Sequence, residues 1–341
     1  MSEPANPRPT LSPDDALPRV EPPTGAFVVQ LFVVPAVIVM VIVAVWVLFN
    51  WLAQMGSDPH QYLEQIRKQN ANSWIAAHNL AEELRTQPAL RQDREVAREL
   101  GLMLQESLDM GGSNPDDVQL RVFLCRALGE FHVSDGLPAL IRAAQTQRRE
   151  EDRDVRRSAL EAIALLISHV RENQTSASSL DESSILPTLL AASREDHATL
   201  REGAAYALGV LGGQAASDRL VEMLSDARPN VRYNAATGLS RQGRAEAAEV
   251  LVEMLDVVNL EGVIEEDGPQ AQDFQRALIA INGLRAARQL VDAQPQLDRT
   301  ALEQAVQDLS APDVAGSFKQ PDYAIEVRSQ AEALLKHWQA P

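Results

Sequence analysis

Two stretches of sequence, LREGAAYALGVLGG at residues 200–213 and VRYNAATGLSRQG at residues 231–243, decide the fold. They begin 31 residues apart, and each is followed by the same five letters, LVEML, at residues 220–224 and 251–255. Apolar or small residues stand at offsets of zero, four and seven, as in Leu200, Ala204 and Ala207, which places them on one face of a helix. The alternation expected of a strand is not seen. The period therefore predicts a repeated pair of helices.

The same helical pattern recurs along the chain. Its further copies begin at Leu120, Val155, Val327 and Phe274, the last without the arginine that follows the first residue elsewhere. Second amphipathic helices are predicted at 137–144, 185–192, 216–224 and 247–255. The unequal spacing of the copies indicates insertions at 172–184 and 259–272. We therefore predict an all-α protein, an α-solenoid of helical hairpins over residues 111–338.

Three segments carry a family resemblance. NVRYNAATGLSRQG at 230–243, TLREGAAYALGVLGG at 199–213 and DVRRSALEAIALL at 154–166 resemble HEAT repeats of the bacterial PBS-lyase HEAT-like type. The resemblance covers about residues 60–338, is strongest over 117–257, and is specific for fold rather than function. It implies that the arginines at the second position of the pattern link neighbouring repeats through their polar loops; these are Arg121, Arg156, Arg201, Arg232 and Arg328. The alternative is that each arginine is simply solvated.

The chain before the repeats has two parts. Residues 1–25 are rich in proline and are expected to form a disordered tail. Residues 26–54 are uncharged and almost continuously apolar, long enough to cross a bilayer, with Trp46, Phe49 and Trp51 expected at one interface. We predict a transmembrane helix; a cleavable signal peptide is the alternative, but the run is long and no basic segment precedes it.

Charges beside the predicted span give little guidance on its orientation. Arg8 and Arg19 precede it, and Arg67 and Lys68 follow it, so the positive-inside rule gives a near tie. The excess of acidic residues in the short tail favours its export. We therefore expect a single-pass membrane protein with the C-terminal domain on the cytoplasmic side.

Residues 58–110 form a less regular start to the repeats. Asp58 and Pro59 are suited to begin a helix, and Trp74, Ala77 and Leu84 belong to a helical stripe. The pattern is typical of a capping repeat, and a juxtamembrane helix is the alternative.

Composition excludes several classes of function. The 341 residues include 31 Lys and Arg against 48 Asp and Glu, a net charge of −17, which argues against nucleic-acid binding and favours a basic or neutral partner. A single cysteine, Cys125, excludes an internal disulfide and a four-thiolate metal site; we predict that it is a buried small hydrophobic residue. Catalytic motifs are missing, the six histidines are scattered, and no His-Glu dipeptide occurs. We expect no cofactor, no metal and no enzymatic activity.

Four carboxylates recur between two repeats. Asp218 and Glu222 lie four residues apart on one predicted second helix, and Glu249 and Glu253 take the equivalent places 31 residues later. Since second helices usually line the concave side of a solenoid, stacking would align an acidic track for a basic partner; a solvated polar face is the alternative.

These features favour a membrane-anchored scaffold or adaptor that binds proteins through its repeats. The alternative is a tetrapyrrole-handling protein resembling phycobilin lyases, although an aromatic content of 4% supplies little material for such a pocket. Recognition of nucleic acid is a third class, and the negative charge opposes it.

Overall fold

The structure is a computed structural model that describes residues 25–54, 59–68, 70–173, 180–260 and 268–339. The chain divides into two compact units, Met1–Asp58 and Pro59–Pro341. The predicted tail lies outside the described residues except for Gly25, and so do the central parts of both predicted insertions.

The first unit contains one apolar helical segment. It comprises α1 (Gly25–Val28), a π-helical turn (Val29–Val33) and α2 (Val34–Gln54). Pro35 lacks the N–H that would bond to the carbonyl of Leu31, and its ring crowds that carbonyl, so a wider turn just before it relieves the conflict.

This helix meets the requirements of length and composition for crossing a membrane. Val29–Phe49 has a mean hydropathy of 3.1, and none of this stretch is buried by other described residues. Trp46 and Phe49 are exposed, whereas the side chain of Trp51 lies outside the described residues.

The second unit is built from helices, and its described residues include no strand. The α-helices of this unit are α3 (Pro59–Arg67), α4 (Ser73–Thr86), α5 (Arg94–Met110), α6 (Pro115–Gly129), α7 (Leu137–Gln145), α8 (Asp152–Asn173), α9 (Glu182–Ala192), α10 (Ala198–Leu211), α11 (Gln214–Met223), α12 (Pro229–Arg241), α13 (Ala248–Leu255), α14 (Pro269–Ala293), α15 (Thr300–Ser310) and α16 (Pro321–Gln339). Every predicted copy of the helical pattern falls in one of α6, α8, α10, α12, α14 and α16. The predicted second helices correspond to α7, α9, α11 and α13, so the prediction of an all-α fold of helical hairpins is confirmed.

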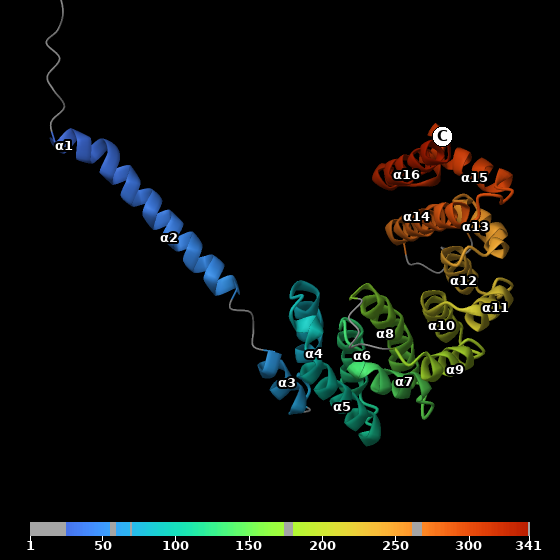
Figure 1. Cartoon of the computed structure of the whole chain (residues 1–341), viewed down its shortest axis with the longest axis horizontal. Helices are drawn as coiled ribbons and strands as arrows, with labels where there is room; N and C mark the ends of the chain where they lie inside the picture. Colours follow the sequence, from blue (N-terminus) through green and yellow to red (C-terminus); the bar gives the residue numbers. More distant parts are fainter. Residues whose placement is uncertain (1–24, 55–58, 69, 174–179, 261–267, 340–341) are drawn as a thin grey trace, which may run out of the picture. The chain divides into compact units, whose positions relative to one another are not determined.

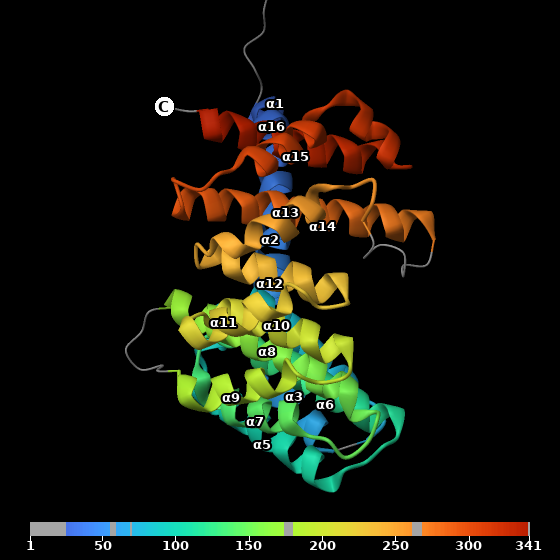
Figure 2. The ribbon, with the colours of Figure 1, turned by 90° about the vertical axis from the view of Figure 1, so that its right-hand side faces the viewer.

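These helices form two layers, which can be followed in Figure 1. One layer, called here the inner layer, contains α4, α6, α8, α10, α12, α14 and α16, and each of these helices packs extensively against the next. The other, the outer layer, contains α5, α7, α9, α11, α13 and α15, whose consecutive members contact each other much less; Figure 2 is seen from this side. The repeat unit therefore curves with the pattern-bearing helices on its concave side, and our placement of the second helices there was wrong.

Small residues explain why the inner layer is the tighter one. A Cβ added to Gly209 would lie 2.6 Å from the Cα of Gly238, so α10 and α12 approach each other backbone to backbone. A Cβ on Gly129 would likewise lie 2.9 Å from the Cα of Ala162, between α6 and α8. Helices with such surfaces come closer than helices faced with leucine, and this difference bends the array.

Polar caps fix the starts of the early helices. The Asp93 side chain accepts hydrogen bonds from the backbone N–H groups of Glu95 and Val96, at 3.0 and 3.1 Å, at the start of α5. Asn114 accepts one from the N–H of Asp117 at 2.9 Å, just before Pro115 opens α6. These bonds satisfy N–H groups that a helix cannot satisfy itself.

The segment before the clear repeats continues the two layers. Within it α4 packs against α6, and α5 packs against α6 and α7, as later hairpins do with their neighbours. The helical stripe predicted around Trp74 and Leu84 is that of α4, whose residues Ala77 and Leu84 are fully buried. Residues 59–110 thus add one helix, α4, to the inner layer and one, α5, to the outer layer.

Candidate functional site

Three of the predicted arginines, one buried and two partly buried, link successive repeats. From α8, Arg156 donates to the carbonyl of Ala144 at 3.0 Å and pairs with Glu195. From α12, Arg232 donates to the carbonyl of Asp226 at 2.9 Å and pairs with Glu253. Each therefore connects an inner helix to the loops or outer helices beside it.

Arg201 makes the most complete of these links. Its guanidinium donates to both carboxylate oxygens of Asp226, at 2.7 and 3.0 Å, and to the carbonyls of Glu195 and Asp196, at 2.9 and 2.7 Å. Burial alone would raise the pKa of Asp226, but the hydrogen bond from Arg201 and one from the backbone of Arg228 hold it below its ordinary value. The hydrogen bond to Asp226 raises the pKa of Arg201.

Arg121 and Arg328 differ from this arrangement in opposite ways. The buried Arg121 donates to the carbonyls of Asp117, at 3.1 Å, and Gly112, and its guanidinium lies 3.8 Å from Asp152; burial lowers the pKa of Arg121. Arg328 is 40% exposed and pairs at 3.6 Å with Glu332 of its own helix. The predicted link between repeats is therefore not formed at Arg328, because α16 has no following repeat among the described residues.

The four predicted docking carboxylates lie on the outer layer, on α11 and α13. Asp218 accepts a hydrogen bond from Gln214 at 2.6 Å and lies 3.9 Å from Arg244, and Glu222 pairs with Arg219. Glu253 accepts from Arg232 and, at 3.0 Å, from the Tyr233 hydroxyl.

Glu249 is the exception. Its side chain is exposed and makes no ion pair or hydrogen bond with the described residues. The structure does not bring the four carboxylates together as one free acidic track on the concave side. Glu253 in particular belongs to the internal framework, and the role of the four in binding stays a prediction.

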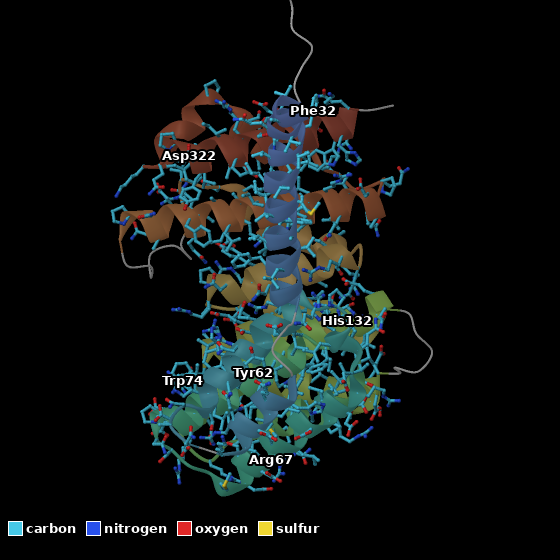
Figure 3. The ribbon with its side chains drawn as sticks, turned by 90° about the vertical axis from the view of Figure 1, so that its left-hand side faces the viewer. Phe32, Tyr62, Arg67, Trp74, His132 and Asp322 are labelled. Atoms are coloured by element: carbon cyan, nitrogen blue, oxygen red, sulfur yellow. The ribbon has the colours of Figure 1, made fainter. Side chains whose placement is uncertain are left out.

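The inner layer presents an aromatic cluster, made of Trp74, His78, Phe123 and Arg126, which sequence reasoning missed. The rings of Trp74 and Phe123 are stacked with centroids 5.7 Å apart, and the His78 ring lies 4.9 Å from Phe123. The guanidinium of Arg126 lies 5.1 Å above the Phe123 ring. Trp74 and Phe123 are half-buried, and Arg126 is exposed; Figure 3 labels Trp74 on α4.

A cavity of about 280 Å³ adjoins this cluster, between α4, α6 and α8. Its charged lining residues are Glu82, Arg85, Arg126, Glu130 and Glu161. Arg85 donates to Glu130 and Glu82 at 2.7 Å each, and the hydrogen bond to Glu130 raises the pKa of Arg85. Aromatic and arginine side chains beside a partly polar hollow are the composition of protein-binding hot spots.

Part of this cluster could have been found from the sequence. Phe123 and Arg126 lie off the buried face of α6, which is formed by Leu120, Leu124 and Ala127. An aromatic ring at such a position is exposed unless another helix covers it. The partner ring of Trp74 comes from 49 residues earlier, and only the packing of α4 against α6 brings the two together.

Two histidines lie side by side where the α6–α7 loop meets α8. The His132 and His169 rings are stacked with centroids 4.9 Å apart, and Nδ1 of His169 lies 3.1 Å from the carbonyl of Gly129. Burial lowers the pKa of His132, and His169 and Arg91 lower it further. Among the described residues, no group of His, Cys, Asp and Glu side chains could hold a metal ion.

Cys125 is fully buried on α6, as predicted. Burial raises the pKa of its thiol to about 12. The thiol is therefore protonated and enclosed at neutral pH, which leaves it little reactivity.

The comparison with protein families agrees with the fold over part of the chain. Residues 186–263 match the family model described as HEAT repeats, a stretch that runs from α9 to just beyond α13. The crystal structure of YibA from Escherichia coli is 15% identical, and the match covers 84% of this chain and 96% of that one with a TM-score of 0.31. No curated protein sequence matches significantly. Residues 186–263 are therefore similar to HEAT repeats, and the stacked helical hairpins on either side of them have the same two-layer arrangement.

Proposed function

We propose that this protein is a membrane-anchored scaffold, without catalytic activity, that binds a partner protein on the inner layer of its repeats. The aromatic cluster carries the proposal. It places two stacked rings and an arginine at the surface of the repeat unit, where no described residue of the chain covers them fully. HEAT repeats in general provide helical surfaces for protein interaction.

Charge beside the cluster supports a basic partner segment. Three carboxylates, Glu82, Glu130 and Glu161, line the adjoining cavity; Arg85 pairs with the first two and Arg157 with the third. The whole chain carries a net charge of −17, which speeds encounter with a positively charged surface. The partner we propose presents a lysine or arginine for the cavity together with an apolar side chain for the rings.

The anchor is the apolar helix of the first unit. Its 21-residue window, Val29–Phe49, has the length and hydropathy of a span and is fully exposed. A signal sequence would meet the same criteria of length and composition. The size of the mature chain distinguishes the two, because a signal sequence is cleaved off whereas an anchor stays attached. We propose that the repeats lie on the cytoplasmic side.

The orientation can be tested with cysteine labelling, since the chain has one cysteine and it is buried. The variant Ser225→Cys places a second thiol at an exposed position beyond α11. A membrane-impermeant maleimide is expected to label it only after the membrane is permeabilised. Labelling in intact cells would contradict the cytoplasmic location.

Binding can be tested by affinity purification from crosslinked membranes with mass spectrometry. The variant Phe123→Ala is expected to lose the partner, because it removes the ring that Trp74, His78 and Arg126 contact. Phe274→Ala is the matched control, since Phe274 is an exposed phenylalanine on α14 of the same layer. Thermal unfolding of each variant checks that folding is preserved.

A third variant changes Asp218, Glu222 and Glu249 to lysine and tests the outer surface; Glu253 is left unchanged because it pairs with Arg232 of the inner layer. Loss of the partner in Phe123→Ala alone supports docking on the aromatic cluster. Loss only in the charge-reversed variant contradicts it and favours the outer carboxylates. Capture of no reproducible partner by the unmodified chain contradicts the scaffold role.

A further inference from the structure

A second pocket, separate from the aromatic cluster, lies at the edge of the array where inner helices begin. It has a volume of about 500 Å³ and is formed by the turn before α8, the first turns of α8, and the start of α10. Its lining residues are Gln147, Arg148, Arg149, Glu150, Arg153, Arg156, His197 and Leu200. We call it the arginine pocket.

The lining is strongly positive in an otherwise acidic chain. Of its four arginines, Arg153 pairs with Glu150 at 2.8 Å, and Arg156 pairs with Glu195. Arg148 donates to the carbonyl of Leu108 in the last turn of α5 at 2.6 Å and makes no ion pair with the described residues. The Arg149 side chain makes no ion pair with the described residues. Two positive charges thus remain without a counterion in the pocket.

Neighbouring carboxylates do not supply that counterion. Asp152 accepts hydrogen bonds from the backbone N–H groups of Arg148 and Arg149, at 3.0 and 3.1 Å, and faces Arg121. Glu151 and Asp154 are exposed and do not line the pocket. Asp152 therefore holds the turn, and Arg148 and Arg149 line both the arginine pocket and a smaller pocket beside it, which Glu151 and Asp152 also line.

One donor in this pocket is buried without an acceptor. The Nε atom of Arg153 is enclosed and has no hydrogen-bond partner in the described part of the chain, while its Nη2 lies 3.2 Å from Nε2 of His197. An unsatisfied buried donor destabilises a protein by about 1–3 kcal/mol. Such a group is satisfied when a ligand oxygen or a water enters the site.

We propose that the arginine pocket binds a phosphoryl group carried on a side chain of a partner protein. Two uncompensated arginines match the charge of a phosphate, which is close to −2 at neutral pH, and guanidinium forks match its oxygens. The N-termini of α8 and α10, which begin at Asp152 and Ala198, add the positive ends of two helix dipoles. Repulsion by the chain's overall charge of −17 disfavours polyanions such as nucleic acids, so a single phosphoryl group fits better.

This inference goes beyond the proposed function, since the arginine pocket and the aromatic cluster are formed by different residues and can be tested separately. The experiments use the full chain in maltoside micelles, because this detergent contains no phosphate. The probes are inorganic phosphate, a library of phosphoserine peptides, the same peptides without phosphate, a nucleoside monophosphate and single-stranded DNA. Titration calorimetry and peptide fluorescence anisotropy measure the affinities.

Two variants, Arg149→Gln and Arg153→Gln, remove the charge and the buried donor of the pocket. Arg157→Gln is the matched control: Arg157 lies on the same helix, pairs with Glu161 at 2.9 Å, and does not line the pocket. We expect the unmodified chain to bind phosphate saturably and to bind phosphopeptides at least tenfold more tightly than their unphosphorylated forms. Both pocket variants should lose at least tenfold in affinity for phosphopeptides, and the control should lose less than twofold. Phe123→Ala is expected to bind phosphopeptides normally.

Four results would overturn the inference. An equal loss in Arg157→Gln would show that binding follows net charge rather than the pocket. Equal binding of unphosphorylated peptides would show that no phosphoryl group is recognised. Tighter binding of the nucleoside monophosphate would make the ligand a free metabolite, and tighter binding of DNA would make it a nucleic acid.

Discussion

The inner and outer layers of the repeat unit differ in the length of their helices, 22 residues in α8 against 9 in α7, and in the size of their contact residues. Between α10 and α12 of the inner layer, Gly209 and Gly238 leave no room even for a Cβ. Between α13 and α15 of the outer layer, a cavity of about 550 Å³ remains, lined by Val252, Leu255 and Ala305 among others. The difference shows that side-chain volume at helix contacts sets the curvature, and with it which helices face inward.

The largest loss of stability should come from adding a side chain between the closely packed helices of the inner layer. Gly238→Val would place a Cβ 2.6 Å from the Cα of Gly209 and 3.1 Å from Leu220, so α10 and α12 would have to separate. We expect a loss of about 3 kcal/mol in the free energy of unfolding, at the upper end of overpacking effects. Chemical denaturation of the full chain in detergent measures it.

Gly316→Ala provides the control, because nothing lies within 4 Å of a Cβ added there. Its stability should change by less than about 0.5 kcal/mol. Equal effects of the two substitutions would contradict close packing as the cause of curvature.

A smaller effect is expected where an arginine joins the layers. Arg201→Gln removes the bidentate pair with Asp226 and the bonds to two carbonyls, so we expect a loss of about 2 kcal/mol. Arg328→Gln, which removes only an exposed pair within α16, should cost less than about 0.5 kcal/mol. Were the two losses alike, the internal arginines would not act as links between repeats.

A still smaller effect, confined to mildly acidic pH, is expected at the loop that joins the two layers after α6. Because the pKa of His132 is lowered in the folded protein, its neutral form is favoured there, and stability should fall as pH drops below the ordinary histidine pKa of about 6.5. His169 and Arg91 oppose protonation, whereas Glu172 and Glu130 favour it. In His132→Gln, thermal unfolding between pH 7 and 5 should show a weaker pH dependence than in the unmodified chain. An unchanged dependence would mean that other groups are responsible.

The smallest effect is expected on the outer surface. Glu249→Lys changes an exposed side chain of α13 that forms no ion pair or hydrogen bond with the described residues, so stability should stay within about 0.5 kcal/mol and partner capture should be unchanged. Parallel thermal melts and crosslinked purifications measure both. Loss of the partner in this variant alone would restore the outer carboxylates as the docking site.

The helices could be predicted from the sequence because their signal is local. The offsets of four and seven in Leu200, Ala204 and Ala207 report a buried face whatever lies against it. The choice of the inner layer could not be made in this way, because it depends on how Gly209 meets Gly238 across two helices. The sequence shows where the small residues lie, but it does not show that they bring two helices close together and so curve the array.

The site residues likewise include some with a local sequence signal and some whose contacts depend on the fold. The repeated arginines were found by pattern. Their acceptors Glu195 and Asp226 also stand 31 residues apart, but only the folded structure shows that Arg156 and Arg201 reach them. Phe123 and Trp74 are 49 residues apart, and nothing local connects them. Conversely, Glu253 looked free by periodicity because the pattern does not show that Arg232 reaches it.

The central claim is that the inner layer binds the partner, and photocrosslinking in native membranes tests it most directly. A photoreactive amino acid replaces either Arg126, which is exposed on α6 beside Phe123, or Glu249, which is exposed on α13 of the outer layer. The account predicts a discrete crosslinked product from position 126 and none from position 249. A product from position 249 alone would contradict it.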